Sequence, residues 1–63
     1  MNEELRRYAK TRGVTLWRIA QKMNISEPTI TRRLRVELNE SDRTAFIDAV
    51  NAVVREREEA SGT

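Results

Sequence analysis

Apolar residues recur every three or four positions along most of this 63-residue chain, the spacing that places side chains on one face of an α-helix. No segment shows the strict alternation expected of a β-strand. The pattern therefore predicts an all-α domain over residues 1–58, with four helices around one core, a fourth helix at about 40–57 and a frayed tail at 59–63. The residues expected to point inward are Leu5, Tyr8, Ala9, Ile19, Ala20, Met23, Ile30, Leu34, Leu38, Ala45, Phe46, Ala49, Val50 and Val53.

Residues that favour helix ends mark the limits of the first helix and the start of the fourth. Asn2 can cap a first helix that ends near Arg12. Gly13 then supplies the left-handed residue that commonly follows a helix. Either Asn39 or Ser41 caps the fourth helix, because both side chains can accept from a backbone N–H of the first turn.

Between these helices, residues 15–35 read T-L-W-R-I-A-Q-K-M-N-I-S-E-P-T-I-T-R-R-L-R, which predicts two short helices joined by a tight turn. Thr15 can cap the first of them and Ser26 the second. Asn24 suits the left-handed conformation that ends the first helix. Pro28 falls in the first turn of the second helix, where its missing N–H costs nothing.

The second of these short helices is expected to turn hydroxyl and guanidinium groups outward. The outward residues are Thr29, Thr31, Arg32, Arg33 and Arg35, with only Glu27 opposing their charge. A short helix with a polar, basic outer face, supported by a neighbouring helix, suits the major groove of DNA.

The same stretch resembles the helix-turn-helix of the Cro and lambda-repressor type. Ala20 matches the small residue in the middle of the family's first motif helix, and Met23, Ile25 and Ile30 match its apolar positions. The phrase I-S-E-P-T-I-T-R-R-L is a familiar form of the recognition segment. With the flanking helices the similarity covers roughly residues 3–54, and it implies the compact four-helix fold of the lambda-repressor type.

The resemblance also implies sequence-specific binding of double-stranded DNA, with a recognition helix at residues 26–35 in the major groove. Arg32 is the best base reader, because a guanidinium can bind guanine O6 and N7 together. The base contacts expected are Glu27, Pro28, Thr31 and Arg32. The backbone contacts expected are Thr15, Trp17, Arg18, Ser26, Thr29, Arg33 and Arg35. Such a protein would be a transcriptional regulator, a repressor acting by occlusion, of the kind found in bacterial phages and mobile elements.

Two positions depart from the family pattern. Asn24 stands where glycine is usual, and Leu16 followed by Trp17 stands where a glutamine often contacts phosphate. The second departure motivates an alternative, a protein-interaction module on the same scaffold that modulates or inhibits a nucleic-acid-processing protein. Trp17 either pads the first and second helices or is an exposed binding residue, and we favour its partial burial.

Charge is divided between the two parts of the chain. Residues 1–36 hold nine Arg or Lys against three Glu, a net charge of +6. Residues 37–63 hold three Arg against seven acidic residues, a net charge of −4. This asymmetry favours a polyanion facing the first three helices and not the fourth.

The residue inventory argues against other function classes. Cysteine and histidine are both absent, which removes the commonest metal ligands, thiol nucleophiles and general bases. The only glycines are Gly13 and Gly62, so no phosphate-binding glycine loop exists. No apolar run approaches a membrane span or a signal-peptide core. We therefore expect a cytoplasmic, non-enzymatic protein with no cofactor and no metal.

A homodimer is also expected, because one module of this size contacts few base pairs while two modules suit a two-fold DNA site. The fourth helix carries more apolar residues than one inward stripe needs. The predicted dimer interface is Ile47, Val50 and Val54.

Overall fold

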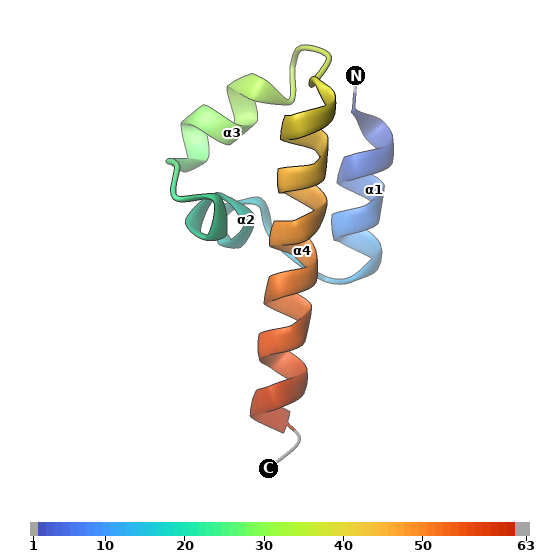
Figure 1. Cartoon of the computed structure of the whole chain (residues 1–63), viewed down its shortest axis with the longest axis vertical. Helices are drawn as coiled ribbons and strands as arrows, with labels where there is room; N and C mark the ends of the chain where they lie inside the picture. The colour runs from blue at the N-terminus through green and yellow to red at the C-terminus, as the bar shows by residue number, and fades with distance from the viewer. Residues whose placement is uncertain (1, 62–63) are drawn as a thin grey trace.

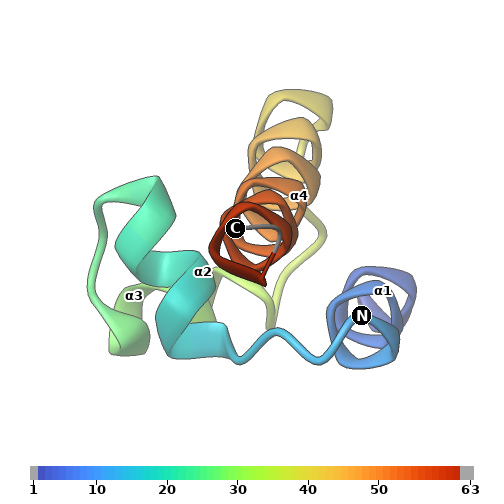
Figure 2. The same cartoon turned by 90° about the horizontal axis from the view of Figure 1, so that it is seen from below.

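The computed structural model describes residues 2–61, and all regular structure within them is helical. The elements are α1 (Glu3–Thr11), α2 (Leu16–Met23), α3 (Glu27–Arg33) and α4 (Glu40–Ser61). Helices α2 and α3 lie together on one side of the molecule and α1 lies on the other, while α4 packs against both α1 and α2 (Figures 1 and 2). The prediction of an all-α domain of four helices is confirmed.

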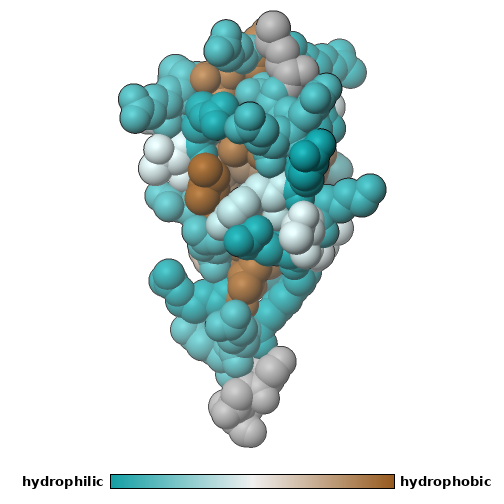
Figure 3. Space-filling view, turned by 90° about the vertical axis from the view of Figure 1, so that its right-hand side faces the viewer, coloured by the Kyte–Doolittle hydropathy of each residue, from teal (hydrophilic) through white to brown (hydrophobic). Residues whose placement is uncertain are grey.

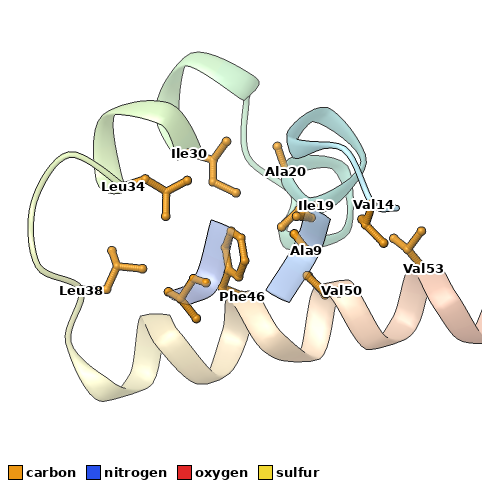
Figure 4. Close-up of a cluster of buried hydrophobic side chains, with 12 residues drawn as sticks. Ala9, Val14, Ile19, Ala20, Ile30, Leu34, Leu38, Phe46, Val50 and Val53 are labelled. Atoms are coloured by element: carbon orange, nitrogen blue, oxygen red, sulfur yellow. The ribbon is translucent and has the colours of Figure 1, made fainter. Parts of the chain in front are cut away.

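The core lies where the inner faces of all four helices meet (Figure 4). Phe46 is its largest side chain, and full burial of each large apolar residue contributes about 1.5–3 kcal/mol. The buried residues are Leu5, Ala9, Val14, Ile19, Ala20, Ile30, Leu34, Leu38, Phe46, Ala49, Val50 and Val53. Of the remaining predicted inward residues, Tyr8 and Met23 pack against this core with part of their surface exposed, and Ala45 is half-buried.

The chain leaves α1 through the turn that Gly13 was predicted to make. Gly13 has a φ of 67°, and its N–H donates to the Lys10 carbonyl at 2.9 Å. The Val14 N–H donates to the Ala9 carbonyl, also at 2.9 Å. Together these two bonds form a Schellman motif, which satisfies the last carbonyls of the helix. Val14 is thereby fixed in the core.

Arg57 of α4 closes the same turn from outside. Its Nη1 donates to the Arg12 carbonyl at 3.1 Å and its Nη2 donates to the Gly13 carbonyl at 2.6 Å. A cation suits this place, because the C-terminal end of a helix carries partial negative charge. These two bonds tie the far half of α4 to the junction of α1 and α2.

Asn2 does not cap α1 with its side chain, which corrects the prediction. Its Nδ2 instead donates to the Leu34 carbonyl at 2.9 Å and to the Val36 carbonyl at 2.6 Å. Asn2 adopts a left-handed conformation, with φ at 63°. The reason is tertiary, because the end of α3 lies within reach of the amide. The start of α1 is thus joined to the end of the predicted recognition segment.

The turn between α2 and α3 forms as predicted, whereas the predicted cap at the start of α2 does not form. Asn24 is left-handed, with φ at 60°, and its N–H donates to the Gln21 carbonyl at 3.2 Å. The Ile25 N–H donates to the Ala20 carbonyl at 2.9 Å. Thr15 occupies the N-cap position of α2, but its side chain makes no capping hydrogen bond. Thr15 is exposed, so water can satisfy the first backbone N–H groups of α2 in its place.

Helix α4 begins at the cap that Asn39 provides and extends further than predicted. The Asp42 N–H donates to Asn39 Oδ1 at 2.8 Å, so Asn39 and not Ser41 is the cap. The helix reaches Ser61 instead of ending near residue 57, and its last turns project beyond the other helices (Figure 1). The bonds of Arg57 support this part. Of the predicted frayed tail, 59–61 is therefore helical, and 62–63 lies outside the described residues.

No helix within residues 2–61 combines the length and the apolar composition that crossing a membrane requires.

Candidate nucleic-acid interface

Helix α3 is held at its start by the predicted cap and along its inner side by two core residues. Ser26 Oγ accepts from the Thr29 N–H at 3.3 Å, and the two hydroxyl oxygens lie 2.7 Å apart. Ile30 and Leu34 are each 1% exposed. These anchors fix which side of α3 faces outward. The Ser26 and Thr29 hydroxyls, both predicted to contact the DNA backbone, are hydrogen-bonded to each other.

The outward side of α3 forms a shallow hollow of about 510 Å³. We call its lining residues the α3 face: Glu27, Pro28, Thr31, Arg32 and Arg35. The four residues predicted to contact bases therefore come together on one surface. Arg35, which was predicted to contact the backbone, lies with them, whereas Arg33 does not line the hollow.

The arginines around the α3 face carry unneutralised positive charge. Arg32, Arg33 and Arg35 are all exposed, and none of them forms an ion pair within the part of the chain that the structure describes. Glu27 stands in the first turn of α3, where the positive end of the helix favours a carboxylate. The face thus combines free guanidinium donors, one hydroxyl and one carboxylate acceptor.

The predicted contacts on α2 lie outside this hollow. Trp17 is 51% exposed and is not among the residues that pack against the core, so the preferred interpretation, partial burial as padding of the first and second helices, is wrong. It points outward because Ile19 and Ala20 supply the buried side of α2. The Arg18 guanidinium lies 5.6 Å from the centre of the Trp17 ring, at a distance that allows a cation–π contact.

Arg18 also belongs to an ion-pair cluster that sequence reasoning missed. Its Nη2 lies 3.5 Å from Glu56 Oε2, and Lys22 Nζ donates to Glu56 Oε1. The hydrogen bond from Lys22 is the main cause that lowers the pKa of the Glu56 carboxyl, and attraction to both cations adds to it. Two cations of α2 therefore form ion pairs with one acidic residue of α4. Arg18 and Lys22 are one helical turn apart, but nothing in the sequence pairs them with a residue more than 30 positions away.

The predicted dimer interface on α4 is wrong in part. Val50 is 0% exposed in the core and has no surface to offer a partner. Ile47 and Val54 are partly buried and pack against the same core. The apolar surplus of α4 is largely used within the monomer, because α1 and α2 both pack against this helix.

The face that α1 covers is mainly hydrophilic, and its hydrophobic residues appear in small separate groups (Figure 3). Arg6, Arg7 and Lys10 are exposed on α1, and none forms an ion pair among residues 2–61. Cations without an ion-pair partner among the described residues therefore lie on both α1 and α3, while Arg18 and Lys22 of α2 share the single carboxylate of Glu56.

Comparisons of the chain with protein-family models, curated proteins and solved structures find no match.

Proposed function

We propose that this protein binds double-stranded DNA through the α3 face. The observation that carries the proposal is the hollow on α3, where a hydroxyl, a carboxylate and two arginines without an ion pair among residues 2–61 share one outward surface. Buried Ile30 and Leu34 anchor α3 in the core, so the backbone that carries these groups is held in place. A preorganised set of donors and acceptors is what reading base edges in a groove needs.

In this proposal, α3 enters the major groove, which is wide enough to admit an α-helix. Arg32 donates to guanine O6 and N7, and Glu27 accepts from cytosine N4. Thr31 packs its methyl group on thymine or donates to phosphate. Arg33, which lies outside the hollow, contacts phosphate and positions the protein without reading sequence.

The biological role that we propose is transcriptional regulation by occlusion in the cytoplasm, as a repressor of the kind that phages and mobile elements carry. This part rests on the resemblance of residues 15–35 to helix-turn-helix repressors. A protein bound across a promoter would exclude polymerase without any catalytic group of its own.

The direct test is a titration of labelled duplex DNA with the protein at several salt concentrations. We expect binding that weakens steeply with salt, because each phosphate that the protein neutralises releases counterions. The logarithm of the binding constant then falls linearly with the logarithm of the salt concentration, with a slope set by the number of phosphates neutralised. Absence of binding at low salt would overturn the proposal.

Two arginine variants separate base reading from phosphate contact. Arg32→Ala should lose about 1–3 kcal/mol at one base pair and relax the preference there. Arg33→Ala should weaken all duplexes by a similar factor and lower the salt slope by about one. Selection of bound sequences from random duplexes measures both effects. An identical, uniform loss in the two variants would contradict the assigned roles.

We also propose that two copies occupy a two-fold DNA site, because a module of this size contacts few base pairs alone. Ile47 and Val54 are the part of the predicted interface that keeps exposed surface. Sedimentation at high micromolar concentration, with and without duplex, tests this. A single copy on DNA under all conditions would refute it.

The exposure of Trp17 favours a second candidate function, a protein-interaction module that modulates or inhibits a nucleic-acid-processing protein. A large aromatic residue on the surface is the kind of residue that dominates the energy of protein interfaces. The salt titration separates the two candidates, because this module alone would leave duplex DNA unbound.

A further inference from the structure

A second hollow, of about 390 Å³, lies between the far half of α1 and the start of α2. We call it the α1–α2 groove. Ala9, Val14 and Leu16 supply its apolar lining, while Arg6 and Lys10 stand one turn apart along its α1 side. None of its lining residues belongs to the α3 face, so the two surfaces are separate.

The charges around this groove all have one sign. Arg6 and Lys10 are exposed, and neither forms an ion pair within residues 2–61. No acidic residue of the described chain lines the groove. Trp17 follows Leu16 in the chain and is 51% exposed, although it does not itself line the groove. An apolar hollow with cations on one side and an exposed tryptophan nearby has the composition of a protein-binding surface.

We propose that the α1–α2 groove binds an acidic segment of a partner protein. An apolar side chain of that segment would fill the hollow over Val14 and Leu16, and its carboxylates would pair with Arg6 and Lys10. The basis is charge complementarity combined with an apolar lining, which together favour an acidic, amphipathic segment over a purely polar one. The proposal does not depend on DNA binding by α3.

A second copy of this chain fits the groove poorly. The acidic segment that projects from the domain is the end of α4, where Glu58 and Glu59 are exposed. Residues 55–60 read R-E-R-E-E-A and contain no large apolar side chain that could fill the hollow. A DNA phosphate would satisfy Arg6 and Lys10 but would leave the apolar lining without a matching group.

The test begins with selection of random displayed peptides on the 63-residue chain. Recovered peptides are then synthesised and titrated into the protein, and the fluorescence of Trp17, the only tryptophan in the chain, is followed. We expect enrichment of peptides that carry Asp or Glu beside a large apolar residue. Enrichment of basic or uncharged peptides, or no enrichment, would overturn the proposal.

Matched variants then locate the binding site. The double variant Arg6→Gln, Lys10→Gln should raise the peptide Kd about tenfold. The control Arg7→Gln, Arg55→Gln removes the same charge from exposed positions outside the groove and should leave the Kd unchanged. Leu16→Gln tests the apolar lining, with circular dichroism to confirm that the fold is kept. Equal effects of the two double variants would refute the site.

Duplex DNA provides the remaining arm of the experiment. If the groove variant weakened duplex binding more than the charge-matched control, the groove would be a DNA surface and the proposal would be wrong. Arg32→Ala, in contrast, should leave peptide binding unchanged. Failure of peptide binding and failure of DNA binding are therefore distinguishable.

Discussion

Replacing Ala20 with leucine should strongly destabilise the domain. Ala20 is 2% exposed, and its methyl group lies on the core side of α2, toward Ile30 (Figure 4). Its carbonyl also accepts the Ile25 N–H at 2.9 Å, in the turn that leads to α3. The space at this position therefore accommodates a methyl group but not an isobutyl group without moving α2 away from α3.

The magnitude follows from the cost of adding atoms to a filled core. Extra methylenes in such a site cost about 1–3 kcal/mol, and a domain of 63 residues has a total stability of only about 3–9 kcal/mol. For a chain of this size, each kcal/mol lowers Tm by about 4–8 °C. Ala20→Leu should thus lower Tm by roughly 4–24 °C.

Thermal unfolding followed by far-ultraviolet circular dichroism measures the change. The matched control is Ala52→Leu, the same substitution at a half-buried position of α4 from which the longer side chain can extend into solvent. That control should stay within about 0.5 kcal/mol of wild type. If Ala20→Leu and Ala52→Leu melted at the same temperature as wild type, Ala20 would not limit the approach of α2 to α3.

Two further predictions concern the bonds that α4 makes to the other helices. Arg57→Ala removes two hydrogen bonds to the end of α1 and should cost about 1 kcal/mol in urea unfolding. Arg55→Ala, which removes an exposed arginine with no ion pair in the described part of the chain, should cost almost nothing. The Lys22 hydrogen bond lowers the pKa of the Glu56 carboxyl below 4.5. The contribution of this hydrogen bond to the stability of the fold is therefore present above pH 4.5 and is lost as the pH falls through the lowered pKa. The stability difference between wild type and Glu56→Gln should therefore shrink from pH 6 to pH 3, and a constant difference would contradict the pairing.

The features that the sequence predicted correctly are local ones. Ser26, Asn24 and Gly13 each bond a backbone group only three residues away, so the residue type and its position beside an apolar stripe were enough. The same holds for Ile30 and Leu34, whose four-residue spacing placed them inside and so left the α3 face outside.

The features that the sequence did not predict depend on tertiary neighbours. Asn2 looked like a cap because of its type and place, but its amide bonds carbonyls 32 and 34 residues away. Arg57 bonds carbonyls 45 and 44 residues away. Trp17 was misjudged because hydrophobicity alone does not tell which side of an eight-residue helix will be covered. Val50 was predicted both to point into the core and to lie in a dimer interface. Its full burial is compatible only with a place in the core.

The central proposal is that the α3 face binds duplex DNA, and mapping amide chemical shifts during a duplex titration tests it most directly. The duplex would be one recovered by selection from random sequences, added to isotopically labelled protein. We predict that the largest shifts fall on residues 26–35, that those of Thr31 and Arg32 are among the greatest, and that Arg32→Ala reduces them. Shifts that leave α3 unchanged, whether they gather at the α1–α2 groove or are absent altogether, would contradict the account.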